Sequence, residues 1–311
     1  TSMPPEKLAS LDETQSIPTI GANSRATWAA YWDLTKPRLS MMAVITALLG
    51  YMAASNGETL ILLAVFFGTA LAAGGAAALN QWWEREEDAM MDRTADRPLP
   101  TGKLSPRATF VFGTVLCLLG PAILWIGGNA LAAVLTAVTV VTYVLLYTPL
   151  KKVTPWSTEI GAIPGALPPL IGWVAAEGSI GWVGLFLFAV LYVWQLPHFM
   201  AISWLYREDY ARSGFRMLSL YDKTGRIVSF RAVIWAVPLL ALTVLAWLAN
   251  ESGWLFLVGG SLLSFGYLRE AWGMFRATER DKPARRLFLA SILFLPCYLI
   301  LMVADRVLFS L

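Results

Sequence analysis

Residues 59–82 read TLILLAVFFGTALAAGGAAALNQW and contain no charged side chain. An α-helix crosses the hydrocarbon core of a bilayer with about 20 predominantly apolar residues, so this run is long enough for one crossing. The chain then becomes strongly charged, reading WEREEDAMMDRTADRPLP over residues 83–100. The stretch therefore predicts a membrane-spanning helix that ends in a charged segment at one membrane surface.

The composition of the whole chain agrees with a membrane protein. Of its 311 residues 57% are hydrophobic and only 14% are charged, and the mean hydropathy is +0.58. Soluble domains carry about 25% charged residues. The net charge of +3 gives no indication of a nucleic-acid partner, and we expect none. The two cysteines, Cys117 and Cys297, lie in apolar runs and are interpreted as packing residues.

Apolar runs separated by polar breaks continue along the chain. They predict an all-α integral membrane protein with nine membrane-spanning helices, at residues 39–57, 59–82, 108–127, 129–148, 158–176, 180–204, 229–249, 253–272 and 286–308. The N-terminal residues are polar and lack the apolar core of a cleavable signal peptide. We expect residues 1–28 to form a disordered cytoplasmic leader and residues 29–311 to form one membrane domain.

The basic residues predict the orientation in the membrane. With nine spans, every Lys and Arg except Arg306 falls on the side that also holds the N-terminus. Cytoplasmic loops of membrane proteins are enriched in Lys and Arg. The N-terminus is therefore expected in the cytoplasm and the C-terminus on the opposite, periplasmic side. Insertion alone explains this bias, but it does not explain the acidic residues at the same surface.

Three oxygen-bearing side chains, Asn80, Glu84 and Asp88, recur at intervals of four residues. On one helix this spacing predicts a stripe of oxygen atoms along one face. Such a stripe suits Mg²⁺, which binds one or two carboxylates together with substrate phosphates. Arg93 and Arg97 follow, and forked arginine hydrogen bonds favour a diphosphate. Pro98 is expected to end the helix. A solvated helix end with compensating charges is the alternative interpretation.

Two further features are expected near the same surface. Lys151 and Lys152 follow the fourth span, where they either anchor the helix or bind an anion. His198 is the only histidine of the chain and follows Pro197, which is expected to kink the sixth span. Because polar residues at membrane depth are costly, His198 is a candidate functional residue. Its alternative role is a hydrogen-bonded histidine at the membrane interface.

Together these segments resemble the haem O synthase (protohaem IX farnesyltransferase) branch of the UbiA prenyltransferase superfamily. The matching motifs are TKPR at 35–38, the Asn80–Glu84–Asp88 spacing with DAMMDRTADRPL at 88–99, GAIPGALPPLIGW at 161–173, WQLPHF at 194–199 and YREDY at 206–210. The sequence also departs from the family pattern: Lys151-Lys152 replaces a Lys-Arg pair, Ser157 the Asn that usually follows it, and Ser213 the Ala before Gly214. Two further departures concern the acidic motifs. Glu84 replaces the aspartate found in much of the superfamily, and Leu205 stands where a second acidic motif ending at Asp209 would begin.

The resemblance implies a UbiA-type bundle of nine transmembrane helices and assigns roles to individual residues. The catalytic residues it implies are Asn80, Glu84, Asp88 and His198, of which the first three bind Mg²⁺ with Asp209 as a further candidate ligand. The implied diphosphate-binding residues are Lys36, Arg38, Arg93, Arg97, Tyr147, Lys151 and Lys152. The second motif, on the haem side, comprises Trp194, Gln195, His198, Glu208, Asp209, Arg212 and Arg216.

The activity implied by the resemblance is transfer of the farnesyl group of farnesyl diphosphate to the 2-vinyl group of haem B. Addition of water then gives haem O and diphosphate at the cytoplasmic face of a bacterial inner membrane. Mg²⁺ is the implied cofactor, and haem A synthase is a candidate downstream partner. His198 is then an axial iron ligand or a proton-transfer group.

Three alternatives remain open at this stage. In the first, the protein is a prenyltransferase whose acceptor is another aromatic compound, a quinone precursor or a chlorin. The WQLPHF motif and the lone Asp209 argue against it. Alternatively the protein carries haem or isoprenoids without chemistry, but no second copy of the acidic stripe marks an internal repeat. A structural membrane subunit would leave the acidic stripe unexplained.

Overall fold

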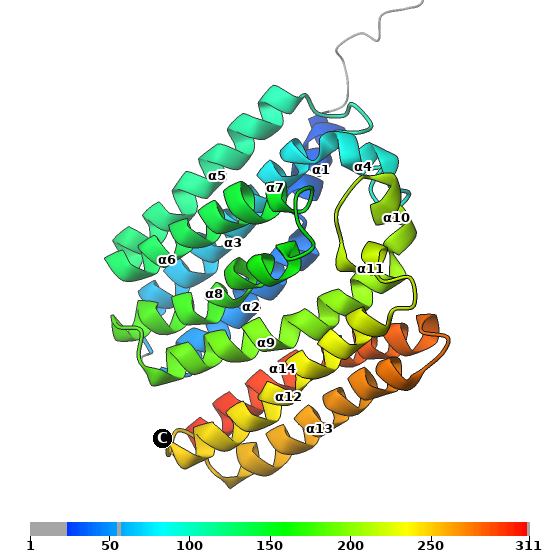
Figure 1. Ribbon diagram of the computed structural model, residues 1–311. Helices are drawn as coiled ribbons and strands as arrows, with labels where there is room; N and C mark the ends of the chain where they lie inside the picture. Colours follow the sequence, from blue (N-terminus) through cyan, green and yellow to red (C-terminus); the bar gives the residue numbers. More distant parts are fainter. Residues whose placement is uncertain (1–23, 55–56, 310–311) are drawn as a thin grey trace, which may run out of the picture.

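All regular secondary structure in the computed structural model is helical within the residues it describes, 24–54 and 57–309 (Figure 1). The elements are α1 (Ser24–Leu34), α2 (Pro37–Met52), α3 (Thr59–Trp83), α4 (Arg85–Met90), α5 (Pro106–Gly127), α6 (Ala130–Val141), the π-helix η3 (Thr142–Tyr147), α7 (Thr148–Leu150), α8 (Ser157–Glu177), α9 (Trp182–Leu205), α10 (Arg207–Arg212), α11 (Leu218–Tyr221), α12 (Arg226–Leu248), α13 (Trp254–Arg276) and α14 (Asp281–Phe309).

Each of the nine predicted spans coincides with a helix, with α6, η3 and α7 forming one continuous span. Among the described residues, seven helices are long and apolar enough to cross a membrane. The other two predicted spans correspond to α2, which is only 16 residues long, and α13, which has 23 residues but is not among the seven. Helix α1 begins at Ser24, inside the range predicted as a leader, whereas residues 1–23 lie outside the described residues.

The outer surface of the bundle is apolar. Large hydrophobic side chains on the long helices point outward, and Ile126 at the end of α5 has 84% of its surface exposed. Only 22% of the most apolar 18-residue stretch of α5 is buried inside the bundle. Exposure of so much apolar surface to water would be unfavourable. Contact with lipid tails carries no such cost, because the tails are as apolar as these side chains. The bundle is therefore built for a bilayer.

Glycines allow the helices beneath the site to pack closely. A Cβ atom on Gly75 of α3 would lie 2.7 Å from the backbone nitrogen of Cys117 on α5, and one on Gly120 would lie 2.7 Å from the carbonyl oxygen of Gly68. A Cβ on Gly172 of α8 would lie 1.8 Å from the carbonyl oxygen of Ala47 on α2. Small residues at such seams let backbones approach, which is the usual packing of membrane helices.

The two ends of the bundle differ. Figure 1 shows α4, α10 and α11 together at one end and the C-terminus at the other. The C-terminal end is held by two adjacent charges of α14: Asp305 accepts a hydrogen bond of 2.9 Å from the backbone of Phe256, and Arg306 lies 2.9 Å from Glu251. The end with α4 and α10 carries the polar motifs and is called the motif end below.

Candidate active site at the motif end

The acidic stripe spans a helix junction. Helix α3 ends at Trp83, and Glu84, with φ −96° and ψ 17°, joins it to α4. The hydrogen-bond ladder nevertheless continues, because the Glu84 amide donates to Asn80 (2.9 Å) and the Asp88 amide donates to Glu84 (2.7 Å). The predicted four-residue register is therefore kept. All three side chains are buried, with exposed fractions of 2%, 3% and 0% in chain order.

The helix does not continue to Pro98, as the sequence had suggested, but ends at Met90. The Thr94 hydroxyl donates a hydrogen bond of 2.8 Å to the carbonyl oxygen of Asp88. A threonine that takes a backbone carbonyl in this way competes with the helical ladder and favours a turn. The chain turns back early, and this places Arg97 against the stripe.

Each of the three stripe residues binds a different cationic side chain. Lys36 donates a hydrogen bond of 3.0 Å to the amide oxygen of Asn80. Lys151 lies 2.8 Å from Glu84, and Arg97 donates to both oxygens of Asp88, at 2.7 and 2.6 Å. We call these six residues, Lys36, Asn80, Glu84, Asp88, Arg97 and Lys151, the charge cluster. It joins segments that lie far apart in the sequence.

Burial and neighbouring charges shift the pKa values of three residues in the charge cluster, Lys36, Lys151 and Asp88. Lys36 precedes α2 with a left-handed φ of 44°, a conformation that costs energy for a residue with a side chain. Burial and the neighbouring Arg97 lower the pKa of Lys36 to about 7. Burial also disfavours charged Lys151, but Glu84 outweighs this and raises the pKa of Lys151. Burial raises the pKa of Asp88, and the two hydrogen bonds from Arg97 oppose that rise.

The π-helix η3 supports the cluster from the fourth span. Thr148, which is fully buried, donates to the carbonyl oxygen of Tyr143 (2.9 Å) and accepts a hydrogen bond of 3.2 Å from the amide of Asn80. The ammonium of Lys151 lies 4.6 Å from the centre of the Tyr147 ring. That ring fills the space beside Gly161, where a Cβ would lie 2.4 Å from it. Single π-turns inside α-helices are frequent at functional sites.

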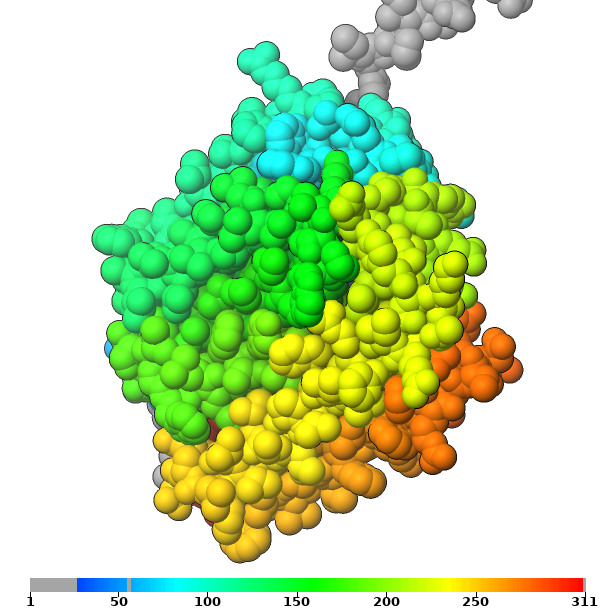
Figure 2. Space-filling view, viewed as in Figure 1, coloured from blue at the N-terminus to red at the C-terminus, as the bar shows by residue number. Residues whose placement is uncertain are grey.

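The segment after α9 closes over the charge cluster. Arg93 lies over the rings of Tyr206 and Tyr210, with its guanidinium carbon 5.1 and 5.6 Å from their centres. Arg212 forms ion pairs with both Asp92 (2.6 Å) and Asp209. In Figure 2 the segment around Asp92 and Arg93, in cyan, lies beside the segment that follows α9, in yellow-green. The sequence predicted both segments as parts of the site, and the structure brings them together.

A backbone contact ties this closure to Lys151. The amide of Arg216 donates a hydrogen bond of 2.7 Å to the carbonyl oxygen of Lys151, and the Lys151 ammonium lies 5.5 Å from the centre of the Phe215 ring. Lys152 pairs with Glu87, which is buried. Thr148 and Phe215 were not singled out from the sequence, because nothing in local spacing distinguishes them from packing residues.

The WQLPHF residues lie in the interface between helices instead. His198 and Trp194 both bond to Ser291 of α14: the His198 Nδ1 atom is 2.6 Å from its hydroxyl, and the Trp194 indole donates to its carbonyl (3.0 Å). Gln195 donates a hydrogen bond of 2.7 Å to Ala162 of α8. Helix α9 continues through Pro197 from Trp182 to Leu205.

Two remaining candidates point to solvent. Arg38 and Glu208 are both exposed, and within the described parts of the chain neither side chain forms an ion pair or hydrogen bond. The side chain of Arg216 is also exposed and makes only a long contact of 3.4 Å with the Val153 carbonyl. These three are free to meet a ligand.

The charge cluster fits a hard cation only when a substrate supplies further oxygens. Across residues 24–54 and 57–309 no group of three or more His, Cys, Asp or Glu side chains is arranged to hold a metal. Glu84, Asp88 and Asn80 supply two carboxylates and one amide oxygen, all buried beside each other in the register described above. Mg²⁺ commonly binds to one or two carboxylates plus phosphate oxygens, so this donor set suits a magnesium diphosphate.

Comparisons with known proteins agree with the motifs. The UbiA prenyltransferase family matches residues 43–292. A protoheme IX farnesyltransferase from Opitutus terrae is 45% identical over 91% of this chain and 96% of its own length. One from Solibacter usitatus is 43% identical over 89% of this chain and 98% of its own length.

Solved structures show the same fold. A digeranylgeranylglyceryl phosphate synthase superposes with a TM-score of 0.77 at 18% identity, covering 90% of this chain and 99% of its own. A UbiA homologue from Archaeoglobus fulgidus, bound to GPP and Mg²⁺, gives a TM-score of 0.59 at 12% identity, covering 88% of this chain and 99% of its own. The resemblance in the motifs is thus confirmed, and the chain belongs to the UbiA prenyltransferase family.

Proposed function

We propose that this protein is a protohaem IX farnesyltransferase, which converts haem B and farnesyl diphosphate into haem O and diphosphate. The observation that carries the proposal is the charge cluster, in which Asn80, Glu84 and Asp88 meet Lys36, Arg97 and Lys151 at the motif end. The names of relatives that are 43–45% identical over about nine tenths of the chain supply the acceptor.

The cluster suggests how the diphosphate is bound. Asn80, Glu84 and Asp88 would hold the cation, and Arg97, Lys36 and Lys151 would exchange their contacts with these three side chains for charge-assisted hydrogen bonds to the diphosphate. Bound Mg²⁺ would stabilise the negative charge that grows on the leaving diphosphate. A UbiA homologue with the same fold has been solved with GPP and Mg²⁺ bound, so this pair of ligands is compatible with the fold. Once these positive groups bind the diphosphate, little further reorganisation would accompany bond breaking.

The reaction then joins two apolar groups away from bulk water. The bond from C1 of the farnesyl group to the diphosphate oxygen breaks, and C1 bonds to the terminal carbon of the 2-vinyl group. Water adds to the other vinyl carbon and loses one proton. The Tyr147 ring, beside Lys151, is placed to stabilise the allylic cation by a cation–π contact, and the buried rings of Tyr210 and Phe215 limit the entry of water.

The haem side is assigned to the segments around α9. Arg38 and Arg216 are exposed and without strong partners, so they are available for the haem propionates. His198 is assigned a contact with the porphyrin through the nitrogen that does not bond to Ser291. Replacing Arg38 or Arg216 with Gln should raise the KM for haem and leave the KM for farnesyl diphosphate nearly unchanged.

We also infer nine crossings of a bacterial inner membrane, with α2 and α13 as the additional two spans. The N-terminus and the motif end then face the cytoplasm and the C-terminus faces the periplasm. The excess of basic residues at the motif end supports this orientation. Haem O would pass to haem A synthase as the downstream enzyme.

The decisive experiment is a mass spectrum of haem after the purified protein has been incubated with farnesyl diphosphate and Mg²⁺. The wild type should form haem O, and Asp88→Asn should be slower by at least about 100-fold. Asp96→Asn is the matched control, because Asp96 lies in the same segment but is exposed and unpaired. Thermal unfolding of each variant shows whether it is folded.

Other outcomes identify the alternatives. Diphosphate release without modified haem, in the presence of another aromatic acceptor, would assign a different prenyltransferase activity. Haem binding without any diphosphate release would show a carrier. Unchanged turnover of Asp88→Asn would remove the charge cluster from the mechanism.

A further inference from the structure

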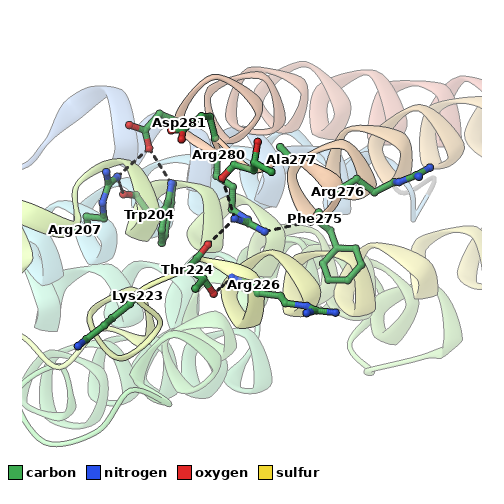
Figure 3. Close-up of a pocket in the computed structure, with 12 residues that line it drawn as sticks. Trp204, Arg207, Lys223, Thr224, Arg226, Phe275, Arg276, Ala277, Arg280 and Asp281 are labelled. Atoms are coloured by element: carbon green, nitrogen blue, oxygen red, sulfur yellow. Dashed lines mark hydrogen bonds and ion pairs between the residues drawn. The ribbon is translucent and has the colours of Figure 1, made fainter.

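A second polar site lies at the motif end, apart from the charge cluster. A pocket of about 620 Å³ is lined by the ends of α9, α12, α13 and α14 and by the loops between them (Figure 3). No residue of the charge cluster lines it. Its walls carry five basic side chains but only two acidic ones, Glu279 and Asp281; the basic ones are Arg207, Lys223, Arg226, Arg276 and Arg280.

The internal contacts of the pocket leave its positive charge uncompensated. Asp281 is used by Arg207 (3.0 Å) and by the indole of Trp204 (2.9 Å). Arg280, in the middle of the pocket in Figure 3, donates to the carbonyl oxygens of Thr224 (2.6 Å) and Thr278 (3.3 Å), which carry no net charge. Its Nε atom is buried without a hydrogen-bond partner. Arg280 is thus a partly exposed cation with a buried Nε atom and no anionic partner, so the pocket favours an anion.

Two more cations flank one side of the pocket. Arg226 and Arg276 are exposed, and in the described part of the chain their guanidinium groups form no ion pair or hydrogen bond. Figure 3 shows both on the same side as Phe275. Arg226 is also the first residue of α12, where the positive end of the helix dipole disfavours a cation. An anion bound to Arg226 would supply the missing partner and offset the unfavourable helix dipole.

The same side of the pocket continues into apolar surface. The Phe275 ring lies 5.6 Å from that of Phe230 on α12 and 5.5 Å from that of Trp272 on α13. Phe230 and Trp272 are about half exposed, as is Ile227 beside Arg226. Both helices run from here along the outer face of the bundle (Figure 1). The ligand that fits combines a negative head with hydrocarbon chains.

We propose that this pocket binds the phosphate of an anionic phospholipid of the leaflet at the motif end. Arg226, Arg276 and Arg280 bind the phosphate, while Phe230, Phe275 and Trp272 contact the glycerol and the first part of the acyl chains. Basic pockets between membrane helices are known to recognise lipid head groups. The proposal requires a membrane-embedded bundle and is independent of the reaction catalysed at the charge cluster.

The test measures lipid binding to the purified full-length protein in detergent by native mass spectrometry. Phosphatidylglycerol should bind saturably, and phosphatidylcholine at least tenfold more weakly. The double variant Arg226→Gln/Arg276→Gln should bind phosphatidylglycerol about 30-fold more weakly, given the usual contribution of a basic residue near a lipid surface. Lys282→Gln/Arg285→Gln is the matched control, because it removes two exposed, unpaired charges at the same end but outside the pocket.

Three results would overturn the proposal. Equal weakening by the control pair would show that diffuse surface charge attracts the lipid. Displacement of phosphatidylglycerol by millimolar inorganic phosphate would show a site for free anions instead of lipid. Unchanged binding in the double variant of Arg226 and Arg276 would show that the pocket does not hold the head group. Since both arginines are exposed, the variant is expected to fold, and its thermal unfolding checks this.

Discussion

Lys151 and Glu84 form a nearly buried ion pair, with side chains only 12% and 4% exposed. In such a pair the loss of one partner is more harmful than the loss of both, because the remaining charge is left without compensation. Arg97 and Asp88 form a second pair of this kind in the charge cluster, so these four residues depend on one another for stability as well as for binding.

At the residue scale we predict an asymmetric double-mutant cycle. Lys151→Met should destabilise the protein by about 3 kcal/mol, because Glu84 remains buried and unpaired. Glu84→Gln/Lys151→Met should recover most of this loss. Thermal unfolding in detergent measures both, with Lys103→Met, an exposed and unpaired lysine, as the control. A double variant as unstable as the single one would contradict the pairing.

The sequence predicted which residues form this cluster but not how they pair. The four-residue spacing of Asn80, Glu84 and Asp88 follows from local helix geometry, and it survived even the junction at Glu84. The pairing of Lys36 with Asn80 joins residues 44 positions apart, and that of Lys151 with Glu84 joins residues 67 apart. Such choices depend on where helix ends meet, which no local pattern contains.

At the element scale, the π-helix η3 positions Thr148, which holds the side chain of Asn80 in place. Thr148 is its link, because the hydroxyl bonds to both Tyr143 and Asn80. We predict that Thr148→Val raises the KM for farnesyl diphosphate several-fold and costs about 1–3 kcal/mol, since two buried groups lose their partner. Thr148→Ser keeps the hydroxyl and should stay close to the wild type. Steady-state kinetics and thermal unfolding give the two readings, and equal behaviour of the two variants would be inconsistent with this role.

The seam between α3 and α5 sets the position of the acidic stripe. We predict that Gly75→Ala destabilises the protein by about 2 kcal/mol or more, because its Cβ would lie 2.7 Å from backbone on α5. Gly266→Ala on α13, where nothing lies within 4 Å, should be neutral or stabilising by up to about 1 kcal/mol. Thermal unfolding compares the two helix-interior glycines directly. A harmless Gly75→Ala would mean that the seam can open.

The lengths of the apolar runs predicted where the long helices occur, but they did not predict the irregular elements. Each of the nine predicted ranges overlaps a helix within the described residues, but the end of α4 at Met90 and the π-turns of η3 were missed. Both depend on hydrogen bonds that compete with the α-helical ladder, namely those of Thr94 and Thr148. Such competition is decided by the surroundings of the side chain and leaves no periodic signal.

At the scale of the whole molecule we predict opposite locations for the two termini. Reporter domains placed in exposed loops at Lys103, Lys223 and Glu279 should report the cytoplasm, and reporters at Asn129, Asn250 and the C-terminus the periplasm. This alternation requires α2 and α13 to cross fully, since each lies outside the seven clear spans. If the N-terminus and the C-terminus were on the same side, either α2 or α13 would not cross the membrane. Accessibility of reporters to a membrane-impermeant reagent is the measurement.

Apolar length, basic-residue bias and the spacing of the acidic stripe are local properties, so the sequence alone determined the membrane class, the helices and the metal-ligand candidates. Only the tertiary structure decided which cation meets which oxygen, that the segment after α9 closes over Lys151, and that Arg226, Arg276 and Arg280 gather around one pocket. These contacts depend on the depth and angle at which helices pack. Glycine seams and buried charges fix that packing by acting between residues far apart in the chain.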